Sequence, residues 1–234
     1  MAITTDPNIE LLMLAASKLG ELADEMVFLG GCVIGLLITD TAAPEIRPTD
    51  DVDAIVSVTT LTDYYALSER LRQKGFAEDT SEDAPVCRWQ CDRVVLDVMP
   101  VEEKVLGFGN KWYKPAMETA NTITIADGID IRIATLPYFL ITKLEAFDGR
   151  GGGDYLLSHD IEDFIAVVDG RAEVVEEVKQ SDGELRQALS ARISNLLIDP
   201  RFVTAISGHM PTDETSQARV KVVMDRLSRL AVIH

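Results

Sequence analysis

The segment from Met26 to Val58 constrains the fold more than any other part of this 234-residue chain. It reads as a short apolar strand that ends at Gly30-Gly31, an apolar helical segment, a proline-containing loop, and a second strand that opens with Asp51-Val52-Asp53. Side chains two positions apart in a strand share one face and lie about 7 Å apart. We therefore expect the carboxylates of Asp51 and Asp53 to lie side by side, where they repel each other unless a cation sits between them.

The two ends of this segment predict two kinds of ligand contact. Oxygen ligands from paired carboxylates suit Mg²⁺ or Mn²⁺, so Asp51 and Asp53 are candidate metal ligands. Gly30 and Gly31 lack a Cβ, which lets backbone N–H groups at the start of the next helix approach phosphate oxygens. The segment therefore predicts a phosphate cradle and a metal pair in one strand-helix-strand unit.

Three further residues extend this candidate site. Arg47 and Thr49 lie in the loop before Asp51 and are candidate contacts to a nucleotide phosphate. Asp97 stands in the middle of the apolar stretch 93–100, where an unpaired carboxylate would be costly to bury. An Asp-x-Asp spacing is weak evidence alone. What makes it informative is the order of strand, Gly-Gly, helix, Asp-x-Asp and a later Asp within a strand.

This order resembles the nucleotidyltransferase superfamily, whose pattern is an apolar strand ending in Gly-Gly or Gly-Ser, a helix, Asp-x-Asp/Glu, and a third carboxylate on a later strand. The resemblance implies an α/β (α+β) fold, built from a mixed sheet with flanking helices. It also implies an NTP substrate and a metal site in which Asp51, Asp53 and Asp97 are the catalytic ligands of Mg²⁺ or Mn²⁺. The pattern of the elements alone favours the same small mixed sheet.

The stretch from Lys143 to Arg150, followed by His159-Asp160-Ile161-Glu162-Asp163, narrows the resemblance to the AbiEii branch. In that branch a Lys-Leu-x-Ala helix with a downstream Arg precedes Arg-Asp-x-x-Asp. This chain departs from the pattern by the Gly-rich insertion 149–153 and by His159 where Arg is usual. The branch includes toxins of toxin–antitoxin systems and related tRNA nucleotidyltransferases, so it implies an RNA acceptor and a cognate antitoxin protein.

The same resemblance assigns residues of the later stretch to the nucleotide site. Lys143 is the candidate catalytic cation on the β- or γ-phosphate, and the alternative is a surface lysine whose stem covers apolar neighbours. Arg150 and Asp160 join the candidate nucleotide-binding residues. For Asp163 the alternative is a favourable interaction with the N-terminal end of its helix.

The charge of the chain bears on the acceptor. The formal net charge is −17, with 39 acidic and 22 basic residues, and such a field repels polyanions such as RNA. It would instead attract a polycationic small molecule such as an aminoglycoside. Basic residues do gather between 215 and 234, where they form either a candidate RNA surface or a solvated helix face. They are Arg219, Lys221, Arg226 and Arg229.

The apolar segments are too short to cross a membrane. The longest nearly unbroken apolar run, from Met26 to Ile38, has 13 residues, whereas a membrane-spanning helix needs about 20. The N-terminus also lacks a basic region followed by an apolar stretch. We expect a cytoplasmic protein without membrane contact.

Turn residues and hydrophobic spacing divide the chain into an α/β core, residues 1–134, and a helical C-terminal part, residues 135–234, which would complete the nucleotide site. The core is expected to begin with a helix of about 18 residues from Pro7. A hairpin is expected around Asp127-Gly128. Further expected helices cover 32–39, 63–74, 137–147, 173–197 and 214–231, and further expected strands cover 27–29, 51–58, 76–78, 86–91, 93–100, 122–125 and 129–133.

The sequence therefore predicts a metal-dependent nucleotidyltransferase that moves a nucleoside monophosphate from an NTP to an acceptor hydroxyl. RNA, and tRNA first, is the acceptor that the AbiEii resemblance favours. A small molecule, favoured by the net charge, or a protein is the alternative acceptor. A noncatalytic interaction protein is the further alternative, and the third carboxylate at the expected position argues against it.

Overall fold

The structure is a computed structural model that describes residues 6–125, 128–150 and 152–233. The chain divides into two compact units. The first unit comprises the residues up to Gly35 together with Arg47–Thr135, and the second unit comprises Leu36–Ile46 and Leu136–His234. Residues 36–46 thus group with the helical C-terminal part, although they lie between the Gly-Gly turn and the Asp-x-Asp strand in the sequence.

The first unit is built on one sheet. In the described residues its seven strands follow the order β3-β4-β5-β2-β1-β7-β6. The pairs β2–β5 and β1–β7 are parallel and the remaining pairs are antiparallel, which confirms the predicted mixed α/β fold. The strands are β1 (Met26–Leu29), β2 (Asp51–Val56), β3 (Ala77–Glu78), β4 (Arg88–Cys91), β5 (Val94–Pro100), β6 (Asn121–Ile125) and β7 (Ile129–Ile133). The predicted hairpin of β6 and β7 forms, and Asp127 of its predicted turn lies outside the described residues.

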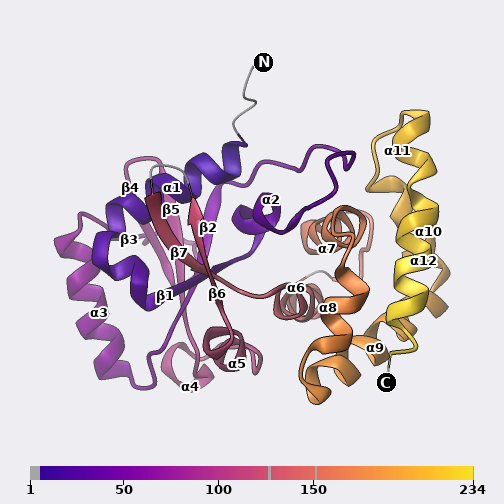
Figure 1. The fold of residues 1–234 in the computed structure, drawn as a ribbon. Coiled ribbons are helices and arrows are strands. Elements are labelled where there is room, and N and C mark those ends of the chain that lie inside the picture. The colour runs from indigo at the N-terminus through magenta and orange to yellow at the C-terminus, as the bar shows by residue number, and fades with distance from the viewer. Residues whose placement is uncertain (1–5, 126–127, 151, 234) are drawn as a thin grey trace. The chain divides into compact units, whose positions relative to one another are not determined.

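Helix α1 (Pro7–Leu19) crosses one face of this sheet (Figure 1) and packs over β2, β5 and β7. Its first turn is capped by Asp6, whose carboxylate accepts a hydrogen bond from Asn8 N at 2.9 Å. The helix has 13 residues and not the expected 18, because Gly20 adopts a φ of 56° and ends it. A 3₁₀ segment, η1 (Gly20–Glu25), leads into β1.

The helical segment after Gly30-Gly31 is shorter than the predicted helix 32–39. It consists of a 3₁₀ turn, η2 (Gly31–Val33), and α2 (Ile34–Leu37). It ends early because the N–H groups of Thr39 and Asp40 both donate to the carbonyl of Gly170, within the second unit. The remaining helices of the first unit are α3 (Leu61–Gln73), α4 (Glu103–Leu106) and α5 (Tyr113–Glu118).

The second unit is helical. Helix α6 packs against α7, α8 and α9, and α12 packs against the same three helices (Figure 1). Its helices are α6 (Leu136–Arg150), α7 (His159–Gly170), α8 (Val174–Gln180), α9 (Gly183–Ile198), α10 (Pro200–Gly208), α11 (Glu214–Ala218) and α12 (Val220–Leu230). Helix α6 continues through Gly149 and Arg150, beyond the expected end at residue 147 and into the Gly-rich insertion. In the part of the chain that the structure describes, every helix is too short or too polar to cross a bilayer.

Candidate active site

Sheet register places the three predicted metal ligands together on one face of the first unit. Strand β2 pairs in parallel with β5, and Asp53 lies directly opposite Asp97. Asp51 and Asp53 are half-buried while Val52 between them is buried, as the predicted alternation requires. The two carboxylates at the start of β2 and the carboxylate within β5 therefore form one acidic site.

The guanidinium of Arg88 contacts two of these carboxylates. Arg88 on β4 stands opposite Asp97 in the antiparallel register and donates to both of its oxygens, from Nε and from Nη2, each at 2.8 Å. The same Nη2 donates to Oδ2 of Asp51 at 2.9 Å. The hydrogen bonds to Asp97 and the negative charges of Asp97 and Asp51 raise the pKa of the Arg88 guanidinium. The sequence showed that Asp97 needs a partner and that the acids need a cation, but it did not identify Arg88, because cross-strand neighbours are set by register.

Gly30 joins the Gly-Gly turn to the acidic site. Its φ is 77°, a conformation that favours glycine, and a Cβ built on it would lie 1.9 Å from Oδ2 of Asp53. A Cβ on Gly31 would lie 3.2 Å from the side chain of Thr49. The backbone after β1 therefore favours glycine most strongly at Gly30, where it approaches the carboxylate of Asp53, and a side chain at Gly31 would require Thr49 to move slightly.

That loop is fixed by a residue which the sequence did not single out. Asn8 of α1 is fully buried and donates through Nδ2 to the carbonyl of Arg47 at 3.0 Å. It also accepts from Thr49 N at 2.8 Å, and the hydroxyl of Thr49 donates to Oδ1 of Asp51 at 3.0 Å. Thr49 thus orients a predicted metal ligand. Arg47 donates from Nη1 to the carbonyl of Pro48.

Gly30→Ala is expected to lower the stability of the first unit by about 1–3 kcal/mol, because the methyl group would overlap Asp53 and the residue would be held at a positive φ. Thermal unfolding measures the loss. Gly149→Ala is the matched control, since a Cβ there has no neighbour within 4 Å, and its melting temperature should equal or slightly exceed that of the wild type. Equal melting temperatures for both variants would show that Gly30 does not approach Asp53 this closely.

The donor set at this site fits Mg²⁺ or Mn²⁺. These hard ions prefer carboxylate oxygens and are commonly held by one or two carboxylates together with substrate phosphates. Within the described residues, no group of three or more His, Cys, Asp or Glu side chains is arranged to hold a metal ion alone. Asp51 and Asp53 would therefore have to share the ion with further oxygen ligands, such as phosphate oxygens.

The second unit brings the later predicted residues into a separate cluster. Lys143 of α6 is buried, and its Nζ donates to Asp163 at 2.6 Å and to Asp160 at 3.3 Å. Asp160 also accepts two hydrogen bonds from the guanidinium of Arg150, both at 2.9 Å. Ser158 caps α7, Asp160 lies in the first turn of this helix, and Asp163 lies almost one turn further on. Asp163 is therefore an ion-pair partner of Lys143 and not only an acid at a helix end.

The pairing in this cluster changes the ionisation of Asp160. Burial on its own would raise the pKa of the carboxyl, but the hydrogen bonds from Arg150 and the charge of Lys143 outweigh burial, and the pKa is lowered. A carboxyl with a lowered folded-state pKa contributes stability that is present above its unfolded-state pKa, near 3.9. That contribution is lost as the pH falls through the lower folded-state value.

We expect the stability difference between wild type and Asp160→Asn to be larger at neutral pH than at acid pH. The asparagine cannot ionise, so the wild type should be more stable near neutral pH, and its advantage should shrink as the pH falls below about 4. Urea unfolding of both proteins between neutral and acid pH measures the difference. An advantage that does not change with pH would mean that the carboxylate of Asp160 is not stabilised by its partners.

The basic residues near the C-terminus do not form the expected solvent-facing surface. Arg219 donates to Asp169 at 2.8 Å and to Asp40 at 2.7 Å, and its side chain is 13% exposed. Arg226 donates to the carbonyl oxygens of Val168 and Asp169. These two arginines join α12 to α7, so they are structural. Among the four candidates, Lys221 and Arg229 are exposed.

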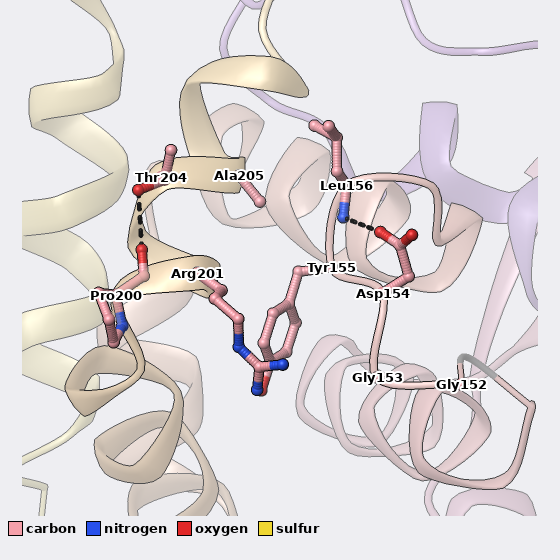
Figure 2. A pocket seen from close by; sticks show the side chains of 9 residues that line it. All are labelled: Gly152, Gly153, Asp154, Tyr155, Leu156, Pro200, Arg201, Thr204 and Ala205. Carbon is pink, nitrogen blue, oxygen red and sulfur yellow. Dashed lines mark hydrogen bonds between the residues drawn. The ribbon is translucent and has the colours of Figure 1, made fainter.

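The second unit also contains a cavity of about 630 Å³ between the loop after α6 and the start of α10 (Figure 2). Tyr155 of this loop stacks on Phe147 with ring centroids 5.0 Å apart, and the guanidinium of Arg201 lies 5.5 Å from the Tyr155 centroid. The volume is in the range of small-molecule sites. None of the predicted site residues lines this cavity. The cavity is lined by Gly152, Gly153, Asp154, Tyr155, Leu156, Pro200, Arg201, Thr204 and Ala205.

The aromatic and basic stretch 111–114 could form either a base-stacking surface or a lid that packs on the edge of the core. Trp112 is only 4% exposed, which favours packing over stacking on a nucleobase. The ammonium of Lys111 lies 4.4 Å from the Trp112 ring centroid.

Comparison with known proteins shows the fold. No protein-family model matches this chain, and no curated protein sequence matches it significantly. Among solved structures, it is similar to an antigenic nucleotidyltransferase-like protein from Paracoccidioides brasiliensis, with 21% identity over 87% of this chain and 94% of the other and a TM-score of 0.51. The similarity establishes a nucleotidyltransferase-like fold.

Two other solved structures match with lower TM-scores. One is the antibiotic-resistance factor ANT(2'')-Ia, with 18% identity over 84% of this chain and 97% of the other and a TM-score of 0.47. The other is a protein from Helicobacter pylori, with 15% identity over 99% of this chain and 92% of the other and a TM-score of 0.48.

Proposed function

We propose that this protein is a metal-dependent nucleotidyltransferase, which transfers a nucleoside monophosphate from an NTP to an acceptor hydroxyl. One observation carries the proposal: Asp51, Asp53 and Asp97 share one face of the sheet, and the backbone at Gly30 approaches Asp53 so closely that an added Cβ would overlap its carboxylate. The same fold can host many activities, so the proposal rests on this site and not on fold similarity.

Each residue of the site has a proposed role. Asp51 and Asp53 would hold Mg²⁺ or Mn²⁺, which when bound would neutralise charge on the triphosphate and on the entering and leaving oxygens. The backbone at Gly30-Gly31 would contact the phosphates. Asp97 would serve as a further metal ligand and accept the proton of the acceptor hydroxyl, whose oxygen attacks the α-phosphorus as pyrophosphate leaves.

The other predicted nucleotide contacts have supporting roles in the proposed site. Thr49 supports Asp51 directly, which gives it a role in positioning the metal ligand. Arg47 lies in the same loop and is a candidate phosphate contact. In the second unit, Lys143, Arg150 and Asp160 form an ion-pair cluster, and their proposed contacts to the triphosphate would require Lys143 to be shared between its two carboxylates and the phosphate.

For the acceptor we propose a small molecule that carries positive charge. The net charge of −17 favours such a molecule, and the arginines that could have formed an RNA surface near the C-terminus are bound to acidic and carbonyl groups instead. RNA, with tRNA first, is the second candidate, because the stretch from Lys143 to Asp163 resembles the AbiEii branch. A cognate antitoxin would be a partner only in that second case.

Label transfer tests the activity and the acceptor together. The protein is incubated with each α-labelled NTP, with or without Mg²⁺ or Mn²⁺, and with an aminoglycoside mixture, total RNA or a protein lysate as acceptor. We expect metal-dependent pyrophosphate release and label on the aminoglycoside. Label on RNA would select the second candidate acceptor. Absence of transfer and of NTP binding under all conditions would contradict the proposed activity.

A further inference from the structure

Arg88 lies where a metal ion would bind, and the mechanism above gives it no role. We propose that Arg88 is an internal counter-ion which competes with the divalent cation for Asp51 and Asp97, and which therefore sets the metal affinity of the site. This inference rests on the proposed function, because it requires that Asp51 and Asp97 are ligands of the metal ion.

The hydrogen bonds show the competition at the level of atoms. Both oxygens of Asp97 and one oxygen of Asp51 accept from the guanidinium at 2.8–2.9 Å. A single nitrogen, Nη2, contacts both acids, so their carboxylates are close enough to share one positive charge. These are the oxygens that a metal ion would use, and a guanidinium next to a divalent cation would add repulsion between like charges.

The contact is built into the fold. Arg88 and Asp97 are directly opposite each other in the β4–β5 register, so their side chains leave the sheet on the same face. The planar guanidinium matches a carboxylate with two parallel hydrogen bonds and keeps its charge at any ordinary pH. The side chains are 25% exposed for Arg88 and 10% for Asp97, so salt screens this pair less than a surface pair.

A fixed positive charge has a defined consequence for the metal site. The divalent ion must displace Arg88 from oxygens that it needs, and the free protein should therefore bind metal weakly. Removal of the guanidinium charge should strengthen metal binding even though it removes stabilising hydrogen bonds. If Arg88 instead only held the carboxylates in position, its removal would weaken metal binding. The direction of the change separates the two roles.

Mn²⁺ binding by the nucleotide-free protein, measured by electron paramagnetic resonance and calorimetry, tests this inference. Arg88→Gln is expected to bind Mn²⁺ on the order of tenfold more tightly than the wild type, because the competing charge is gone. Arg93→Gln is the matched control, since Arg93 is an exposed arginine between β4 and β5, and its affinity should equal that of the wild type. Arg88→Lys keeps the charge without the two-pronged contact and should lie between the wild type and Arg88→Gln.

The possible outcomes separate this inference from the proposed function. Tighter Mn²⁺ binding by Arg88→Gln supports it, and if that variant does not fold, tighter binding by Arg88→Lys supports it. Wild-type binding of Mn²⁺ with equal or weaker binding by the folded variants overturns the role of Arg88 and leaves the metal site intact. If neither the wild type nor any variant binds Mn²⁺, with or without NTP, the metal site and the inference both fail.

Discussion

Asp53→Asn is expected to reduce nucleotidyl transfer at least about a hundredfold while the protein remains folded. Even residues that only orient a metal ligand are worth about 10- to 100-fold in metal affinity or activity, and Asp53 is a proposed ligand itself. The asparagine has nearly the same shape, so it fits beside Gly30, but its neutral amide binds a divalent cation poorly. The measurements are label transfer at saturating NTP and Mg²⁺ and, on the same preparation, thermal unfolding.

Asp50→Asn is the matched control for this experiment. Asp50 carries the same side chain, is exposed, and lies one residue before β2, so its replacement should leave transfer unchanged. Asp51 is less suitable, because it is also a partner of Arg88 and its replacement removes an ion pair. Replacing both Asp51 and Asp53 would relieve the repulsion between their carboxylates, but it would also remove the ion pair between Asp51 and Arg88. Wild-type transfer by Asp53→Asn would show that the carboxylate has no catalytic role.

Lys143→Ala is expected to destabilise the second unit by about 3–5 kcal/mol, the range found when one partner of a buried ion pair is removed. Its ammonium donates to the buried carboxylate of Asp163 at 2.6 Å and to Asp160, which it shares with Arg150. The alanine would remove this positive charge from two buried carboxylates. The sequence alone suggested a phosphate contact whose loss would weaken NTP binding and leave the fold nearly unchanged.

Urea unfolding distinguishes the two roles of Lys143. Lys179→Ala, which replaces an exposed lysine of α8 in the same unit, is the control and should unfold like the wild type within about 0.5 kcal/mol. Lys143→Arg keeps the charge and should recover part of the stability. If Lys143→Ala unfolds like the wild type but binds NTP about 1.5–3 kcal/mol more weakly, its ion pairs are dispensable and the phosphate role is correct.

The order and type of the elements in the first unit could be predicted from the amino-acid pattern. Alternating hydrophobicity and turn residues predicted β1, β2, the β4–β5 hairpin and the β6–β7 pair, because strands of period two leave a direct pattern in the sequence. The sequence also determined that Asp51 and Asp53 share a face, since that depends on neighbouring residues in one strand. Errors fell at helix ends, such as Gly20 and Thr39, where a left-handed glycine or a carbonyl from a distant residue stops the helix.

Which distant residues contact one another could not be predicted from the sequence, because it depends on how the elements pack. The register of β4 on β5 pairs Arg88 with Asp97, the buried Asn8 fixes the loop before β2, and Asp53 fills the space at Gly30. Packing within the second unit also places the guanidinium groups of Arg219 and Arg226 against acids and carbonyl groups and not in solvent. The charge of each residue can be read from the sequence. Whether two charged residues form an ion pair depends on distances of a few ångströms between elements far apart in the chain, and packing sets those distances.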